Sequence, residues 1–438
     1  MEVDKTTLDD LAIFNTEEEL SIFNKINHSI TSRGVEQLQR NISKPLSTAN
    51  AIYDVQQTLM LLSRESKHWP KQISNGTIMM VERFFEANIE TIPSRPSKIS
   101  TLGYKLINTH DYSLVKYSIT HCFDFIKGVL QLIEHFSKPG TPVLLESKLS
   151  DARKILDKPQ LTLLKDFLKS GDIPSTQMLQ LAHFLKYNYR HSLLELLHIF
   201  AHIDAWYGMA MAVVNLNLVY PEIIESSQPT LEVNGLYHLL LNNPVSYDVK
   251  LDDRTNFLFL TGANMAGKST FIKAVGGAVF LAHTGMGVPA KKMRLSVFDG
   301  MLSNINVIDN IMKGESYFFN EVQRIKATVK KVSDGKKWLI LIDELFKGTN
   351  VQDAMKCSTA VIEGFLKITD SLFILSTHLY EIGDELRRYP NISFNYFETA
   401  VIDDQLSFNY QLRKGISDDR LGYLILQKEG VVKMLEDL

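Results

Sequence analysis

The feature that most constrains the fold is a short apolar segment that runs directly into a glycine-containing loop. Residues 258–270 read Leu-Phe-Leu-Thr-Gly-Ala-Asn-Met-Ala-Gly-Lys-Ser-Thr. They contain the full pattern G-x-x-x-x-G-K-[ST], whose fixed positions are Gly262, Gly267, Lys268 and Ser269. A helix-forming run, 271–280, follows. A strand, a loop and a helix in this order predict a phosphate-binding loop; the alternative, an ordinary glycine-rich turn, does not require these flanks.

The chemistry of this loop predicts ATP and Mg²⁺ as its ligands. A triphosphate needs many converging N–H donors, and glycines let the backbone wrap around the β-phosphate while the next helix directs its dipole there. We expect Lys268 to reach the β- and γ-phosphates and the Ser269 hydroxyl to ligate Mg²⁺. The expected nucleotide-binding residues of the loop are Gly262, Ala263, Asn264, Met265, Ala266, Gly267, Lys268, Ser269 and Thr270.

Composition places the chain among ordinary globular proteins. Its 438 residues allow two or three domains, and 45% apolar and 22% charged residues are typical values. A net charge of −3 gives no sign of nucleic-acid binding and does not exclude it. Two cysteines, Cys122 and Cys357, predict no disulfide framework. Without a signal peptide or an apolar run of about 18 residues, we expect a cytoplasmic protein that does not enter a membrane.

The first half of the chain has the pattern of a helical bundle. Ile52, Val55, Leu59 and Leu62 repeat at helical spacing after the candidate caps Ser47 and Thr48. Similar repeats are Leu161, Leu164, Phe167 and Leu168, and the run 192–215. Glycine and proline fall between these runs. Residues 1–225 are therefore expected to form an all-helical domain whose leucine and aromatic stripes are core.

The second half has a different pattern, which begins after the expected linker 226–229. Apolar strands are predicted at 257–260, 339–342 and 372–375, and a strand of period two runs over 406–412. Buried strands separated by helical segments predict a mainly parallel sheet covered on both faces. The predicted fold class is thus α plus α/β, with residues 230–438 forming a P-loop nucleotide-hydrolase domain.

Three polar side chains follow two of these predicted strands. Asp343 and Glu344 end the apolar segment Trp338-Leu-Ile-Leu-Ile, and His378 ends residues 372–378. In P-loop enzymes the first carboxylate holds Mg²⁺ and the second accepts a proton from the attacking water, while the histidine is placed to donate to the γ-phosphate. Alternatively, a strand-end carboxylate is a helix cap and a single histidine is structural. The expected catalytic residues are Glu344, His378 and Lys268, with Ser269 and Asp343 at the metal.

Taken together, five segments resemble the MutS family of DNA-repair ATPases, which are relatives of ABC-type ATPases. Residues 261–270 are similar to the family's loop T-G-P-N-M-x-G-K-S-T, and residues 343–353 are similar to D-E-x-x-x-G-T-[ST]-x-x-D. Residues 376–378 are similar to A-T-H, and residues 305–321 are similar to I-G-A-x-D-x-x-x-x-G-x-S-T-F-x-x-E. Residues 287–290 also match the family. Looser matches in the first half are Arg33-Gly34, Pro45-Leu46, Ile52, Ile203-Asp204 and Tyr220-Pro221. The resemblance runs over residues 30–425 and implies a helical core and lever domain before an ABC-like ATPase domain.

The resemblance also implies a dimer with shared ATP sites. Ser316, which follows Gly314 and precedes an expected helix, would approach the γ-phosphate bound by the opposite subunit. Its alternative role is a simple N-cap. Tyr410 lies where the family places a ring near the adenine. A homodimer that binds DNA and works with downstream repair proteins is the implied assembly.

Departures from the family pattern shape the expected function. The roughly 30 residues before the core are too few for a mismatch-recognition domain. The helical half spans roughly 190 residues, and this short length favours a reduced or absent DNA clamp. Little of the sequence after the ATPase half is left to form the helix-turn-helix that helps such proteins dimerise. The expected function is therefore an ATP-binding and ATP-hydrolysing protein of DNA repair or recombination that acts on DNA of unusual structure. Mismatches themselves would not be read directly.

Two other functional classes stay open. One is a transporter-type or chromosome-scaffold ATPase, although the chain has no L-S-G-G-Q signature. The other is a nucleotide-gated interaction module without DNA binding. The basic clusters Arg153-Lys154 and Lys291-Lys292 with Arg294 suit DNA phosphates, but they equally suit solvated faces.

Overall fold

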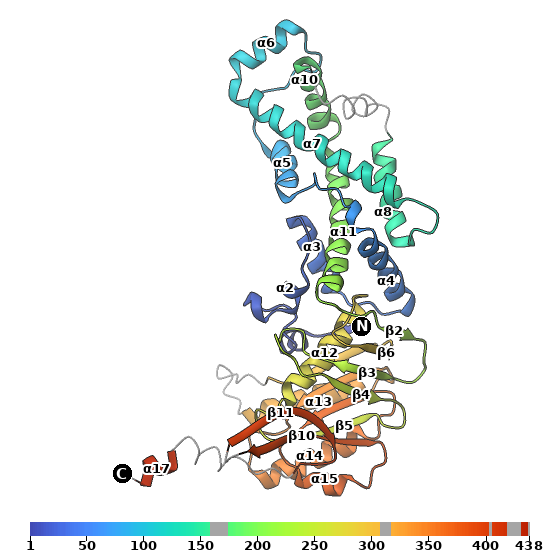
Figure 1. The fold of residues 1–438 in the computed structure, drawn as a ribbon, viewed down its shortest axis with the longest axis vertical. Helices are drawn as coiled ribbons and strands as arrows, with labels where there is room; N and C mark the ends of the chain where they lie inside the picture. The colour runs from blue at the N-terminus through green and yellow to red at the C-terminus, as the bar shows by residue number, and fades with distance from the viewer. Residues whose placement is uncertain (158–173, 307–316, 403–404, 418–430, 437–438) are drawn as a thin grey trace. The chain divides into compact units, whose positions relative to one another are not determined.

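A computed structural model describes residues 1–157, 174–306, 317–402, 405–417 and 431–436 (Figure 1). The chain divides into two compact units. The sheet unit comprises residues 1–25, 44–53 and 216–438, and the helical unit comprises 26–43 and 54–215. Ser316 and the predicted repeat at 161–168 lie outside the described residues.

The described part of the helical unit consists of helices, as the sequence pattern predicts. They are α3 (Ser32–Ile42), α4 (Ala49–Arg64), the short η2 (Ser66–His68), α5 (Asn75–Glu86), α6 (Lys98–Ile107), α7 (Thr109–Phe136), α8 (Val143–Leu156), α10 (Ser175–His183), the π-helix η4 (Phe184–Asn188) and α11 (Arg190–Asn215). The stripe Ile52, Val55, Leu59 and Leu62 is buried on α4. Thr48 Oγ1 accepts a hydrogen bond from the Ala51 N–H at 3.3 Å, which confirms the predicted N-cap.

Helix α11 is the central element of this unit. It packs against α3 and α8, and buried side chains occupy nearly all of its faces. By length and composition alone it could cross a membrane, but 72% of its most apolar window is buried inside the protein. A helix that is hydrophobic all round and covered by neighbouring helices is a core helix.

A buried carboxylate joins α11 to the start of α3. Asp204 is fully buried and accepts hydrogen bonds from the backbone N–H of Ile30 at 3.0 Å and of Thr31 at 2.9 Å, and from Thr31 Oγ1 at 2.7 Å. A Cβ at Gly34 would lie 2.0 Å from Asp204 Oδ2. Only glycine therefore lets the helices approach this closely, which gives a physical reason for both residues at these positions.

The sheet unit is built on seven strands in the order β1-β7-β8-β9-β5-β10-β11. Their bounds are β1 (Glu2–Val3), β5 (Phe257–Thr261), β7 (Gly300–Asn304), β8 (Trp338–Asp343), β9 (Leu372–Ser376), β10 (Ile392–Ile402) and β11 (Gln405–Lys414). All neighbouring pairs are parallel except β10 and β11. The mainly parallel sheet is confirmed. The period-two strand lies at its edge, where one face is free to be polar.

Helices cover the two faces of this sheet. α13 (Tyr317–Val332), α14 (Val351–Phe365) and α15 (Glu381–Leu386) share one apolar core with β5, β8 and β9. α12 (Lys268–His283) packs on the opposite side, where Gly276 approaches the side chains of Leu341 and Leu11. The remaining described helices of the unit are α1 (Lys5–Asp10), η1 (Glu18–Leu20), α2 (Ile22–Ile26), which crosses into the helical unit, and α17 (Val431–Glu436).

A second, four-stranded sheet has the order β2-β6-β3-β4. Its strands are β2 (Glu222–Ile224), β3 (Leu231–Leu236), β4 (Tyr247–Leu251) and β6 (Lys292–Ser296). The sequence analysis did not predict this sheet. Because β2 pairs with β6, residues 226–229 connect two strands of one sheet, and the expected linker does not separate the units. The compact sheet unit already begins at residue 216.

The N-terminal segment also differs from the expectation that residues 1–225 form one helical domain. Residues 1–25 belong to the sheet unit, because β1 extends the large sheet beside β7. The buried Asp10 carboxylate accepts hydrogen bonds from the Ile305 N–H at 3.0 Å, the Asn306 N–H at 3.0 Å and the Ser303 hydroxyl. No local sequence pattern reports such a long-range pairing.

The Asp204 network predicts a large loss of stability on truncation. Asp204→Ala would leave the buried N–H and hydroxyl of Thr31 and the partly buried N–H of Ile30 without their acceptor, so the free energy of unfolding should fall by about 3 kcal/mol. Urea denaturation followed by far-UV circular dichroism measures this. Asp151→Ala, which removes an exposed carboxylate paired with Lys154 at 2.9 Å, is the control and should change stability by less than about 1 kcal/mol. Equal effects of the two substitutions would contradict the assignment.

Candidate functional site

The glycine-containing loop connects β5 to the first residue of α12, as predicted. Gly262 and Gly267 have φ of 140° and 107°, and Met265 adopts a left-handed φ of 68°. A Cβ at Gly262 would lie 3.2 Å from Phe397, and one at Gly267 would lie 3.3 Å from the Tyr410 ring. The loop is therefore held in a tight arc whose conformation and close neighbours both require glycine.

Lys268 lies inside this arc. Its Nζ donates hydrogen bonds to the carbonyls of Gly262 at 2.8 Å and Ala263 at 3.0 Å, and the residue is buried. Burial lowers the pKa of Lys268, while the nearby charges of Glu344 and Asp343 act in the opposite direction. An ammonium group held among loop carbonyls and next to two carboxylates has its charge concentrated where phosphate oxygens would enter.

Asp343 is fixed at the end of β8 by the neighbouring strand. It is buried, lies opposite Ser376 in the β8–β9 register, and accepts a hydrogen bond from the Ser376 hydroxyl through Oδ1. The backbone N–H of Glu344 donates to the Ser376 carbonyl at 3.0 Å. Both predicted carboxylates are thus anchored to β9 at the carboxyl edge of the sheet, where ligands of parallel sheets bind.

The Glu344 carboxylate contacts two basic side chains, one histidine and one lysine. Its Oε1 lies 3.2 Å from His378 Nδ1 and its Oε2 lies 3.0 Å from Lys347 Nζ. Burial alone would raise the pKa of Glu344, but the His378 hydrogen bond and the Lys347 charge outweigh it and lower the pKa to about 2. The Glu344 carboxylate is therefore fully ionised at neutral pH, and its contacts with His378 and Lys347 fix its orientation beside the end of β8.

The turn after β8 is strained and supported from α13. Glu344 and Phe346 have left-handed φ values of 67° and 58°, which cost energy for residues other than glycine. The buried Glu321 of α13 accepts the backbone N–H of Lys347 at 3.1 Å and of Gly348 at 3.2 Å. Glu321 therefore holds the strained turn that orients Glu344. In the sequence, Glu321 is only the last residue of the segment 305–321, and nothing local indicates this role for it.

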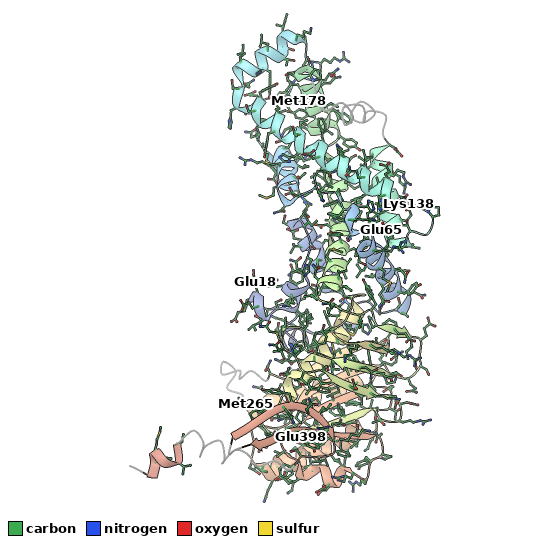
Figure 2. The ribbon with its side chains drawn as sticks, in the orientation of Figure 1. Glu18, Glu65, Lys138, Met178, Met265 and Glu398 are labelled. Atoms are coloured by element: carbon green, nitrogen blue, oxygen red, sulfur yellow. The ribbon has the colours of Figure 1, made fainter. Side chains whose placement is uncertain are left out.

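One cavity of about 590 Å³ brings most predicted site residues together. Its lining includes Asn264, Met265, Gly267, Lys268, Ser269, Thr270, Asp343, Glu344, Lys347 and Tyr410. Met265, labelled in Figure 2, is exposed at the loop. His378 is not part of this lining, but its ring contacts Glu344, which is. Of the remaining loop residues, Gly262 and Ala263 supply the carbonyls that hold Lys268, and Ala266 is buried beneath.

The cavity has a wall that sequence reasoning missed. Leu241, Asn243 and Val245 of the β3–β4 connection, and Tyr247 at the start of β4, line it. The Tyr247 ring packs edge-on against Phe271 and Phe397, with centroids 5.4 Å and 5.6 Å away. The turn residues Asn242-Asn243-Pro244 signal a chain reversal, but nothing local indicates that this reversal approaches the loop after β5.

Tyr410 lines the cavity at the strand edge. It has a left-handed φ of 54° and is 40% exposed. Its ring stacks near the Phe408 ring, with centroids 6.3 Å apart, and also lies beside Gly267, whose missing side chain makes room for it.

The donor set fits a magnesium nucleotide. A loop of backbone N–H groups at a helix start, a buried lysine, an exposed serine hydroxyl and a buried carboxylate face one cavity of a size usual for small-molecule sites. Oxygen ligands of this kind are those that Mg²⁺ prefers, and it retains several waters.

Comparisons with known proteins agree with this geometry. A family model described as MutS domain V matches residues 258–435. The DNA mismatch repair protein spellchecker 1 of Drosophila melanogaster is 32% identical over 195 residues, which are 44% of this chain and 20% of that protein. The DNA mismatch repair protein MutS of Thermotoga maritima is 28% identical over 247 residues, 56% of this chain and 30% of the relative.

A third relative is the DNA mismatch repair protein MSH3 of Vanderwaltozyma polyspora, which is 29% identical over 280 residues, 62% of this chain and 27% of that protein. In all three, the chain spans less than a third of the relative's length. The match to MutS domain V starts at the second residue of β5 and includes the loop, both carboxylates and His378. Residues 258–435 are therefore similar to MutS domain V, and the chain resembles DNA mismatch repair proteins over this part of its length.

Proposed function

We propose that this protein binds and hydrolyses ATP with Mg²⁺ in the cavity between the β5–α12 loop and the ends of β8 and β9. The observation that carries the proposal is the convergence of Lys268, Ser269, Asp343 and Glu344 on one cavity. Nucleotide binding alone would not require an ionised carboxylate beside the metal ligand. The proposal includes the arrangement of the sheet unit as a P-loop ATPase domain of the ABC-like type.

Each side chain has a proposed task. Lys268 and the loop N–H groups bind the β- and γ-phosphates, and Ser269 and Asp343 would hold Mg²⁺, which neutralises charge on the phosphates. Glu344 orients the attacking water and accepts its proton. His378 contacts Glu344 through Nδ1, which leaves the far side of its ring to donate to the γ-phosphate. Tyr410 stacks on the adenine.

The site is proposed to be completed by a second copy of the chain. Residues 317–332 form α13, and Ser316 precedes this helix directly, so Ser316 is the candidate that contacts the γ-phosphate in trans. Closure of the dimer would require ATP to bind the closed state more tightly than the open state. Hydrolysis would then open it.

The partner proposed for the helices is DNA. The relatives are named DNA mismatch repair proteins, and the proposed role of this chain is in DNA repair or recombination on DNA of unusual structure, with downstream repair proteins as further partners. The helical unit, residues 26–43 and 54–215, is proposed as the core and lever domain, and the sheet unit is proposed as the ATPase domain. Two free cysteines suit the proposed cytoplasmic location.

One observation favours the alternative of a nucleotide-gated interaction module without DNA binding. In the first basic cluster, Lys154 pairs with Asp151 at 2.9 Å, and Arg153 donates to Ser137 at 2.6 Å. In the second cluster, Arg294 pairs with Glu222 at 3.3 Å. Paired cations attract phosphates less strongly than free ones, so these clusters by themselves support DNA binding weakly.

The role of Glu344 gives a direct prediction. Glu344→Gln should leave ATP affinity nearly unchanged, because the amide is isosteric, but should lower the rate of hydrolysis at least about 100-fold, because the amide accepts no proton. Phosphate release and equilibrium ATP binding measure the two quantities. The matched control is Glu381→Gln on the exposed first turn of α15, which should hydrolyse ATP normally. Unchanged hydrolysis in Glu344→Gln would refute its role as base.

Glu321 is predicted to act by positioning Glu344. Glu321→Ala should lower kcat roughly 10- to 100-fold with little change in KM for ATP, because the strained turn loses both of its acceptors. Glu321→Gln keeps one acceptor oxygen and should recover part of kcat. Steady-state kinetics beside thermal unfolding distinguish this from general destabilisation. A rise in KM with normal kcat, or no recovery by glutamine, would count against it.

DNA binding is tested by mobility shift with perfect duplex, mismatched and branched DNA, each with ATP and at two salt concentrations. We expect tighter binding to branched DNA than to perfect duplex or mismatched DNA, which serve as the controls. We also expect affinity to fall steeply with salt, because phosphate contacts release counterions. Absence of binding to every DNA at low salt would favour the interaction module.

A further inference from the structure

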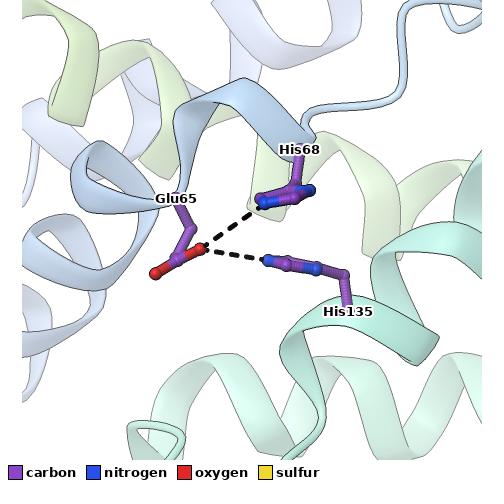
Figure 3. A group of neighbouring side chains, drawn as sticks. All are labelled: Glu65, His68 and His135. Carbon is purple, nitrogen blue, oxygen red and sulfur yellow. Dashed lines mark hydrogen bonds and ion pairs between the residues drawn. The ribbon is translucent and has the colours of Figure 1, made fainter.

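Three potential metal ligands converge in the helical unit, and none of them belongs to the proposed nucleotide site (Figure 3). Glu65 directly follows α4, His68 ends η2, and His135 lies in the last turn of α7. Glu65 and His68 are three residues apart on the chain, whereas His135 comes from a helix 70 residues away from Glu65. The fold, not the local sequence, therefore assembles this group.

The separations suit a shared cation better than a hydrogen-bond network. One carboxylate oxygen, Glu65 Oε2, lies 3.3 Å from His135 Nε2 and 3.9 Å from His68 Nε2, and all three ligand atoms lie within 4.8 Å of one another. The second distance is too long for a hydrogen bond. Metal bonds of about 2.0–2.1 Å in a tetrahedral site place ligand atoms roughly 3.3–3.4 Å apart. The pair of Glu65 and His68 would therefore have to close by about half an ångström, and the two imidazole nitrogens, which lie within 4.8 Å of each other, by at most about 1.5 Å.

The three side chains are already oriented. The Glu65 Oε1 atom is 3.3 Å from Arg64 Nε, which leaves Oε2 to face the two imidazoles. The two histidine rings stack with centroids 3.8 Å apart, and the His135 ring also packs edge-on against Phe136 at 4.9 Å. Such outer contacts fix the direction of metal ligands in known sites. Glu65 and His135 are half-buried and His68 is exposed, so a cation could enter from solvent.

The surroundings restrict which cation would bind. His68 and His135 line an open cavity of about 720 Å³ together with Lys67, Lys71, Lys138 and Glu134. The lysines oppose any dication electrostatically, so affinity must come from coordinate bonds of the imidazole nitrogens. Imidazole suits Zn²⁺ and its transition-metal neighbours, whereas Mg²⁺ and Ca²⁺ require oxygen ligands.

We propose that Glu65, His68 and His135 form a Zn²⁺ site with water as the fourth ligand. Bound Zn²⁺ would tie the end of α7 to the junction of α4 and η2, which the stacked histidine rings and the contact of His135 with Glu65 already join. This role does not depend on the proposed ATPase function. Because a metal that binds the folded state stabilises it, the site should raise the thermal stability of the protein.

The experiment titrates Zn²⁺ into the metal-stripped full chain in the presence of excess Mg²⁺, which saturates oxygen sites such as the one proposed at Asp343. Calorimetry should report one Zn²⁺ per chain and a higher Tm, with no such response to Mg²⁺ or Ca²⁺ alone. The variants His68→Ala, His135→Ala and Glu65→Gln should each weaken binding at least about 10-fold. The matched control His110→Ala removes an exposed histidine of the same helix, α7, and should bind as the wild type does.

Two further measurements keep the outcome decisive. Circular dichroism and Tm, both measured in the presence of a chelator, establish that each variant is folded. Glu65→Gln is the most conservative substitution, so it still tests Zn²⁺ binding if a histidine variant unfolds. Substitution by Co²⁺ gives a visible spectrum that reports nitrogen ligation directly and should disappear in the variants. Absence of Zn²⁺ binding, or binding that survives all three substitutions, overturns the proposal.

Discussion

The parallel pairing of β5, β9 and β8 is the constraint on which the site depends. In the observed register Leu260 lies beside Ser376, and Ser376 lies beside Asp343, so the three strands end at the same level. Parallel strands present their carboxyl ends on one edge, and the loop after β5 and the carboxylates after β8 must therefore meet there. Every residue of these three strands is buried, with helices on both faces of the sheet, which fixes the register against slippage.

The strained turn after β8 connects this edge to α13. Left-handed conformations at two non-glycine residues persist only where the surroundings supply compensating interactions. Here a buried carboxylate on α13 accepts two N–H groups of the turn, and the Phe318 and Phe346 rings pack 5.7 Å apart. A movement of α13 would therefore reach the carboxylate of Glu344 through one rigid turn. If the residue before α13 senses the nucleotide of a second subunit, as proposed, this connection is the shortest route to the reacting groups.

Much of the fold follows from local patterns in the sequence. The stripe on α4 and the apolar runs of β5, β8 and β9 are strong signals because burial imposes their periods directly. The second sheet is not predicted because its strands are short and have mixed polarity. β10 is not predicted although it is long and pairs with the adjacent β11, because its other partner, β5, comes from a distant part of the chain. The first 25 residues were assigned to the wrong unit for the same reason: the hydrogen bonds of Asp10 join residues almost 300 positions apart.

The sequence by itself determined which residues form the loop after β5 and the carboxylates at the end of β8. Glycine, lysine and paired acids at fixed spacings have few other physical uses, and their order along the chain carries the family pattern. Tertiary structure decided what lies around them: the wall formed by Val245 and Tyr247, the support of Glu321, and the meeting of His135 with Glu65 and His68. These three features depend on packing between segments that are distant in the sequence. Many residue types are compatible with the local backbone at such positions, so no spacing in the sequence predicts the contacts.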